Sequence, residues 1–120
     1  MTRDDFARWL GAYVDAWRSY DRDAIGDLFT EDAEYRYHPW DEPVRGRTAI
    51  VDNWIDNRDE PGTWSADYVP FAVEGSDAVA TGTSRYDDAQ GGRMYHNVFL
   101  CRFDGDGRCR EFTEVYAKQR

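Results

Sequence analysis

The apolar residues of this chain repeat with a helical period near the N-terminus and mostly with a strand period after residue 60. Between residues 4 and 20 they recur at the spacing i, i+3, i+4, i+7 and i+11, which predicts an amphipathic helix. The side chains on this stripe are Phe6, Trp9, Leu10, Tyr13 and Trp17. Thr2 followed by Asp5 resembles the capping box that begins a helix.

Two shorter helices are predicted over residues 22–30, with Asp21 as N-cap, and 47–57. Five strands are predicted over residues 34–38, 64–74, 78–86, 93–103 and 108–117, with turns near residues 75–77, 90–92 and 104–107. Their order, α-α-β-α-β-β-β-β, predicts an α+β fold with a mainly antiparallel sheet.

The strand over residues 64–74 carries a proline, Pro70, which indicates an edge position or a bulge. Simple alternation along it puts Val69, Phe71 and Val73 on one face and Tyr68 and Ala72 on the other. The following strand is small on one face, where Ala78, Ala80, Gly82 and Ser84 alternate. Such a face lets another element approach closely.

Length and charge limit the function classes. A chain of 120 residues is the size of one domain, so we expect a single domain over residues 1–120. A net charge of −9 argues against nucleic acid and anionic membranes as partners. No apolar run reaches the length of about 20 residues that a membrane helix needs. The charged start, residues 1–5, lacks an apolar signal core, so we expect a cytoplasmic location.

The two cysteines, Cys101 and Cys109, flank the predicted turn at residues 104–107 almost symmetrically. A reducing compartment favours two thiols, with a cross-strand disulfide as the alternative. Zinc is disfavoured because the chain has only two histidines, neither near this pair in sequence. Asp41 and Glu42 beside His38 are interpreted as a solvated loop, and we expect no metal and no cofactor.

Aromatic residues are unusually frequent: eight tyrosines, six phenylalanines and five tryptophans outnumber valine, isoleucine and leucine together. Tyrosine and tryptophan each carry a polar atom that needs a partner when it is buried. The number of tyrosine and tryptophan residues is larger than a hydrophobic core alone requires. We therefore expect some of them to line a cavity.

Three stretches in order carry a resemblance to a known family. Residues 20–33 (YDRDAIGDLFTEDA) are similar to its "gDldalaalfadDa" stretch, and residues 43–50 (PVRGRTAI) to its "P-x-x-G-x-x-a-I". Residues 103–108 (FDGDGR), followed by Phe112 and Glu114, look like its "f-x-D-G-k-I" ending. The chain thus resembles the nuclear transport factor 2-like superfamily, which includes SnoaL-like polyketide cyclases and ketosteroid isomerases.

The resemblance implies a curved sheet wrapped around three helices, forming a cone with one pocket at its wide end. It also implies homodimers that pair through the outer face of the sheet. It does not fix the function, because the same cone hosts isomerases, dehydratases, cyclases, hydrolases and non-catalytic binding modules.

A ketosteroid isomerase combines a general-base Asp with an oxyanion hole made by a Tyr and a protonated Asp. In the resemblance, the oxyanion Tyr falls on Tyr13, the base Asp on Tyr37 and the second Asp near Val98 or Phe99. A phenol is a poor base at neutral pH, so standard 3-oxosteroid isomerisation is not expected. Tyr13 either lines the pocket or belongs to the core.

In SnoaL-like cyclases a His and an acid on the last strands act in proton abstraction, and His96 and Glu114 are the nearest match. Phe112, Glu114 and Tyr116 alternate on one predicted face, which we take as inward. A desolvated carboxyl there would have a raised pKa and could act near neutral pH. The alternatives are a structural hydrogen bond between strands, or a solvent-facing Glu114 paired with Arg85, Arg102 or Arg110.

Two functions follow. The first is a cofactor-free enzyme that transfers protons on a small apolar or aromatic substrate, with Tyr13, His96 and Glu114 as catalytic residues. Its expected substrate-binding residues are Trp17, Tyr35, Tyr37, His38, Trp40, Trp54, Phe99, Phe112 and Tyr116. The second is a ligand-binding or dimeric assembly module without chemistry.

Overall fold

The computed structural model describes residues 1–87 and 92–120, so part of the turn expected at 90–92 lies outside the described residues. The helices are α1 (Arg3–Ser19), α2 (Arg22–Asp27) and α3 (Arg47–Asp56). The strands are β1 (Phe29–Arg36), β2 (Val44–Arg45), β3 (Trp64–Glu74), β4 (Asp77–Tyr86), β5 (Met94–Phe103) and β6 (Cys109–Lys118). The predicted α+β class is confirmed.

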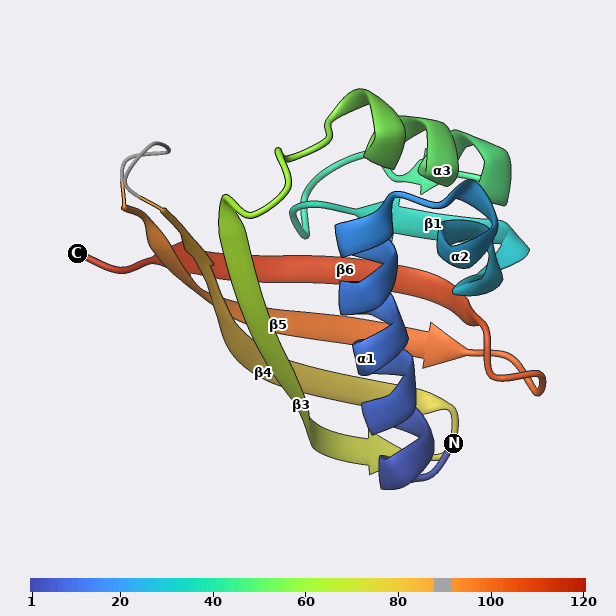
Figure 1. Ribbon diagram of the computed structural model, residues 1–120. Helices are drawn as coiled ribbons and strands as arrows, with labels where there is room; N and C mark the ends of the chain where they lie inside the picture. The colour runs from blue at the N-terminus through green and yellow to red at the C-terminus, as the bar shows by residue number, and fades with distance from the viewer. Residues whose placement is uncertain (88–91) are drawn as a thin grey trace.

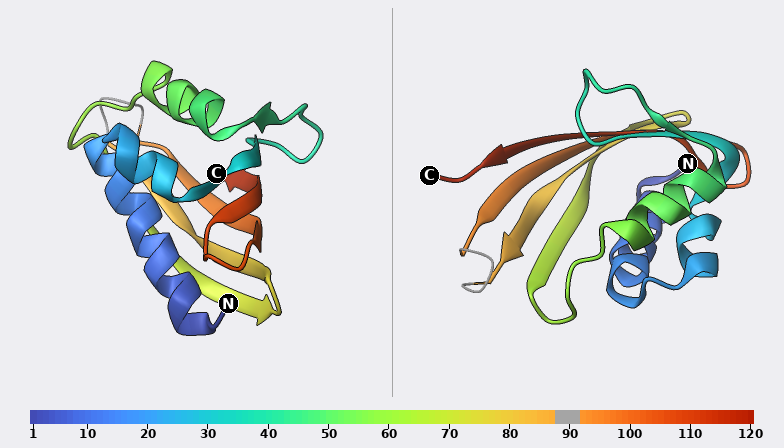
Figure 2. Two further views of the ribbon diagram at one scale, coloured as in Figure 1. Left: turned by 90° about the vertical axis from the view of Figure 1, so that its right-hand side faces the viewer. Right: turned by 90° about the horizontal axis from the view of Figure 1, so that it is seen from above.

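The capping box predicted for α1 is present. Thr2 accepts a hydrogen bond from the backbone N–H of Asp5, and Asp5 accepts one from that of Thr2. The helix ends at Tyr20, whose φ of 49° lies in the left-handed region. Four side chains of its stripe, Phe6, Trp9, Leu10 and Tyr13, are buried, and Trp17 is half-buried. All three helices lie on one side of the curved sheet (Figures 1 and 2).

The strand order in the sheet is β2-β1-β6-β5-β4-β3. Strands β3 to β6 form an antiparallel meander, as predicted. The last strand, β6, also pairs with β1 in parallel, with Tyr35 beside Phe112. This parallel pairing joins the first and last strands and makes the sheet mixed.

The early boundaries differ from the prediction. Helix α2 ends at Asp27, and β1 begins at Phe29 rather than at residue 34. Phe29 fits a helical stripe, but the side chain is fully buried beside β6, where it pairs with Cys109. Tertiary packing therefore overrides the local helical pattern. The two-residue strand β2 is not among the strands that the sequence predicts.

Pro70 does mark a bulge, because the register of β3 on β4 shifts between Pro70 and Ala72. Tyr68 and Pro70 are buried, whereas Val69 and Phe71 are exposed. The prediction that Val69, Phe71 and Val73 share a face is therefore wrong. The extra residue reverses the alternation, and Val73 packs against the core.

The face of β4 that carries small residues allows β3 to lie close to it, as predicted. A Cβ atom on Gly82 would lie only 2.0 Å from the carbonyl oxygen of Asp67 and 2.6 Å from the ring of Tyr68. The Tyr68 side chain therefore needs a glycine at this point of the neighbouring strand.

Both cysteines are buried as free thiols, so the disulfide alternative does not hold in this structure. Burial raises the pKa of Cys101, which keeps that thiol protonated. In the described part of the chain, no helix is long and apolar enough to cross a membrane.

Candidate functional site

A cavity of about 630 Å³ lies between the helices and the concave face of the sheet. Its lining comes from α1, β1, α3, the segments that follow each of these three elements, and strands β3 to β6 with Arg93 just before β5. Among the described residues the lining consists of Tyr13, Trp17, Tyr20, Tyr35, Tyr37, His38, Asn53, Trp54, Asn57, Asp59, Tyr68, Ser84, Tyr86, Arg93, Tyr95, Asn97, Glu114 and Tyr116. All eight tyrosines of the sequence are in this set.

The most buried part of the lining is made by tyrosines. The hydroxyls of Tyr13, on α1, and Tyr35, on β1, lie 2.8 Å apart and share a hydrogen bond. Burial raises the pKa of both phenols well above 10, so both stay protonated at neutral pH. They can donate hydrogen bonds to a ligand, but they cannot act as bases.

Glu114 is the acidic residue at this buried part of the cavity. Burial raises the pKa of its carboxyl from 4.5 to about 7, against the opposing effects of Asn97 and His38. The Nδ2 atom of Asn97, on β5, lies 3.5 Å from a carboxyl oxygen of Glu114. Ser84, on β4, donates to Oδ1 of Asn97 at 3.0 Å, which turns the amide N–H groups toward Glu114.

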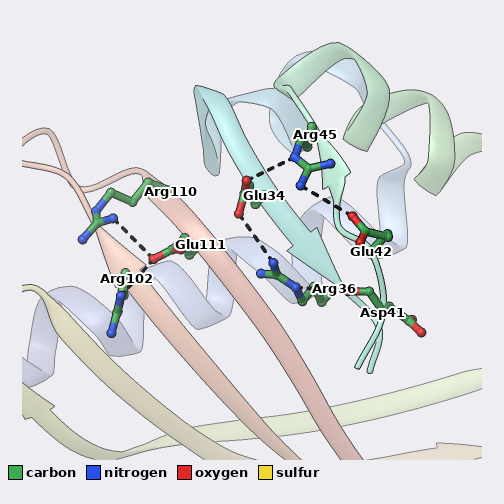
Figure 3. A network of polar contacts seen from close by, with 8 residues as sticks. All are labelled: Glu34, Arg36, Asp41, Glu42, Arg45, Arg102, Arg110 and Glu111. Carbon is green, nitrogen blue, oxygen red and sulfur yellow. Dashed lines mark hydrogen bonds and ion pairs between the residues drawn. The ribbon is translucent and has the colours of Figure 1, made fainter. Parts of the chain in front are cut away.

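The alternative, in which Glu114 faces solvent and pairs with an arginine, does not describe Glu114. It describes Glu111 on the same strand. Figure 3 shows Glu111 between Arg102 and Arg110, both 3.3 Å away. Glu34 is paired in the same way with Arg36 and Arg45 (Figure 3). Among the described residues, no arginine or lysine forms an ion pair with Glu114. The raised pKa of Glu114 follows from this missing countercharge together with burial.

A histidine with two partners lies farther from the core. Nδ1 of His38 donates to the carboxylate of Asp41 at 2.9 Å, and Nε2 lies 3.0 Å from the hydroxyl of Tyr116. The side chain of Trp40 is 79% exposed and stacks on the imidazole, at 4.9 Å between ring centroids. This cluster therefore holds His38 and Tyr116 beside the cavity.

The helix side of the cavity is also polar. Tyr37 donates to Oδ1 of Asn53 at 2.6 Å, and Trp17 donates through Nε1 to Asp59 at 3.0 Å. The backbone N–H of Asp59 donates to the hydroxyl of Tyr20 at 2.8 Å. A ligand in the cavity would thus meet hydrogen-bonding groups from both the helices and the sheet.

Eight of the predicted site residues line this cavity: Tyr13, Trp17, Tyr35, Tyr37, His38, Trp54, Glu114 and Tyr116. Phe99 and Phe112 lie beneath the lining in the core, where both are buried. Trp40 reaches the site only through its stack on His38.

The predicted couple of His96 with Glu114 is wrong. Glu114 pairs across the strands with Phe99, while His96 pairs with Ala117. His96 lies three positions before Phe99 on the same strand, and an odd step reverses the direction of a side chain, so His96 points to the opposite face. There it is exposed, and its Nε2 lies 2.8 Å from the side-chain oxygen of Gln119.

The residue that the prediction missed is the next one along, Asn97. The same alternation that places Glu114 inward places Phe99 and Asn97 inward on the partner strand. Other lining residues, such as Tyr68, Tyr86 and Asp59, carry no local signal of their position. Among residues 1–87 and 92–120, no three His, Cys, Asp or Glu side chains gather as a metal site would require.

Residues 10–112 match the family model of the SnoaL-like domain, so the chain belongs to the SnoaL-like family. Its fold is that of the nuclear transport factor 2-like superfamily, as the resemblance implied. No curated protein matches the chain.

Solved structures of similar fold support the same placement. An NTF-2 like protein of unknown function from Burkholderia xenovorans LB400 is 20% identical, with a TM-score of 0.75 over 98% of this chain and 86% of that one. A candidate ketosteroid isomerase from Kribbella flavida is 16% identical, with a TM-score of 0.73 over 98% and 82%. An LEH-like epoxide hydrolase from M. tuberculosis is 14% identical, with a TM-score of 0.72 over 96% and 84%. At these identities the likeness concerns the fold alone.

Proposed function

We propose that this protein is a cofactor-independent enzyme that transfers protons on a small aromatic or apolar substrate held in the tyrosine-lined cavity. The observation that carries the proposal is Glu114, whose carboxyl lies in the cavity with a pKa of about 7. A group with such a pKa is present in both protonation states near neutral pH. It can therefore accept a proton in one step and return it in another.

The tyrosine pair supplies the second part of this mechanism. In the Tyr13–Tyr35 pair one hydroxyl proton is used within the pair, and the other stays available to a ligand. When Glu114 removes a proton from carbon next to a carbonyl, negative charge develops on the carbonyl oxygen. A phenol that donates to this oxygen stabilises the transition state. Isomerisation, dehydration and cyclisation all use such a step.

A test that needs no natural substrate uses 5-nitrobenzisoxazole. A base removes the proton from its C3 carbon, the N–O bond breaks, and the product is a coloured cyanophenolate. We expect the protein at pH 8 to accelerate this ring opening, and Glu114→Gln to lose about 10²-fold or more of the acceleration. Glu111→Gln, which removes an equal charge outside the cavity, should retain it. Equal rates in the two variants would refute Glu114 as the base.

The second candidate function is ligand binding without chemistry, and the polar lining on both sides of the cavity favours it equally. Native mass spectrometry of protein purified gently from its source separates the two. A retained small molecule that the protein leaves unchanged supports binding alone. A retained molecule that is converted, with conversion lost in Glu114→Gln, supports the enzyme.

We further infer that two copies of the chain pair through the outer face of the sheet. Four residues form a row across neighbouring strands: Val69 on β3, Thr81 on β4, Val98 on β5 and Val115 on β6. This row crosses four strands on the face that turns away from the helices. Phe71 adds a ring that is 68% exposed. An exposed apolar surface of this kind is typical of a protein–protein interface.

A further inference from the structure

The cavity has an unusual composition for a site that binds apolar molecules. All eight tyrosines of the chain line it together with two tryptophans, and no aliphatic side chain belongs to its described lining. Small-molecule pockets usually combine aromatic with aliphatic side chains. An aromatic ring carries negative charge density on its faces, which attracts cations. A wall built only of rings and polar groups is therefore suited to positive charge.

The structure contains one example of such an interaction in the cavity lining. The guanidinium of Arg93 lies over the ring of Tyr86, 4.8 Å from its centroid, and 5.7 Å from that of Tyr95. Tyr86 and Tyr95 lie at the ends of β4 and β5, away from the buried part of the cavity. The buried tyrosines, such as Tyr13, Tyr35 and Tyr68, have no guanidinium or ammonium stacked on them among the described residues.

The acidic groups of the lining fit the same ligand. Glu114 lies at the buried part of the cavity, and Asp59 lies beyond the end of α3. Arg93 and His38 are the only basic side chains in the described lining. The net charge of −9 also attracts cations toward the protein.

A neutral ligand would deepen the burial of Glu114 without supplying a countercharge, which costs free energy. A cation with apolar substituents supplies that charge and presents a surface that stacks on the tyrosine rings. We propose that the ligand of this cavity is an organic cation, an ammonium that carries alkyl or aryl groups. This inference narrows the substrate class of the proposed function and rests on that function for the role of the site.

The experiment compares two ligands of the same shape that differ in charge. One is 4-(trimethylammonio)phenol, and the other is 4-tert-butylphenol, in which carbon replaces the nitrogen. Isothermal titration calorimetry at pH 8 gives both dissociation constants. We expect the cation to bind about tenfold more tightly or better, because cation–aromatic and ionic attractions are available to it alone. Equal or weaker binding of the cation would overturn the inference.

Two pairs of variants show where the preference for the cation arises. Glu114→Gln should reduce the ratio of the two affinities several-fold, and Glu111→Gln should leave it unchanged although the net charge changes equally. An equal reduction in both variants would mean that overall charge causes the preference, and would overturn the inference. Tyr37→Leu should weaken binding of the cation, whereas Tyr37→Phe, which keeps the ring face, should not.

The outcomes separate this inference from the proposed function. Ring opening of 5-nitrobenzisoxazole that depends on Glu114, together with tighter binding of the neutral phenol, overturns only the cation preference. A cation preference that depends on Glu114, without any ring opening, overturns only the catalytic proposal.

Discussion

The hydroxyl groups of Tyr13 and Tyr35 lie 2.8 Å apart and join the first helix to the first strand inside the cavity. The rings of both tyrosines also stack on the ring of Phe112, with centroid distances of 5.5 Å for Tyr13 and 4.5 Å for Tyr35. The pair thus links the buried wall of the site to the core beneath it.

We expect this hydrogen bond to appear as coupling between the two residues. Tyr13→Phe and Tyr35→Phe should each lower the free energy of unfolding by about 1 kcal/mol, because each leaves the other hydroxyl without its partner. The loss of unfolding free energy in the double variant should be smaller than the sum of the two single losses by at least about 0.5 kcal/mol. Urea unfolding of the three variants measures this, and strictly additive costs would show that the hydroxyls do not interact.

The raised pKa of Glu114 predicts how stability depends on pH. The carboxyl has a pKa near 4.5 when unfolded and about 7 when folded, so folding favours its protonated form. The stabilisation that protonated Glu114 contributes to the folded state is complete below about pH 4.5 and is lost as the pH rises through about 7. The lost free energy is about 3 kcal/mol at most. Relative to Glu114→Gln, the wild type should therefore lose stability between pH 5 and pH 8.

Glu111→Gln is the matched control for this experiment. It lies on the same strand and is paired with two arginines outside the cavity. Its difference from wild type should vary by less than about 1 kcal/mol over the same pH range. If the free energies of unfolding of wild type and Glu114→Gln changed equally with pH across this range, the raised pKa of Glu114 would be contradicted.

Gly82→Ala tests the close approach of β3 and β4. The new methyl group would collide with the backbone of Asp67 and the ring of Tyr68, neither of which can move away easily. We expect a loss of at least about 2 kcal/mol in thermal or urea unfolding. Gly105→Ala, where nothing lies within 4 Å, should change stability by less than about 0.5 kcal/mol. Similar effects at both positions would contradict this account of the small face.

Pairing through the outer face predicts a change of mass in solution. Phe71→Asp places a charge on the apolar face of β3 and should convert a dimer into a monomer, as measured by analytical ultracentrifugation. Trp40→Ser removes another exposed ring, one that stacks on His38 away from this face, and should leave the dimer intact. A wild-type monomer at high concentration would disprove the pairing.

The elements with a strong repeating pattern could be predicted from the sequence. The stripe of α1 and its cap at Thr2 are local features, and α1 was confirmed within one residue at each end. The start of β1 could not be found this way, because Phe29 fits both a helix and a strand. Its partner, Cys109, lies on the last strand and gives no local signal.

The same limit applies to the site. The sequence predicts that Glu114 points inward because Phe112 and Tyr116 share its face, and that alternation holds along β6. The chemistry of an imidazole favours His96 in the sequence, although one step along the strand reverses the direction of a side chain. The inward residue is Asn97, whose side-chain amide is not an acid or a base near neutral pH and so gives no sign of a catalytic role in the sequence.

The position of β6 affects how the site comes into being. This strand carries Glu114 and lies between β1 and β5, so it joins the two parts of the sheet that precede it in the chain. During synthesis on a ribosome, the helices and five other strands leave the exit tunnel before it does. Until β6 inserts, the concave face has a gap at its centre and the cavity lacks its carboxyl group. The nascent protein therefore gains its binding site and its proposed base in one late step, and truncation before β6 should abolish both together.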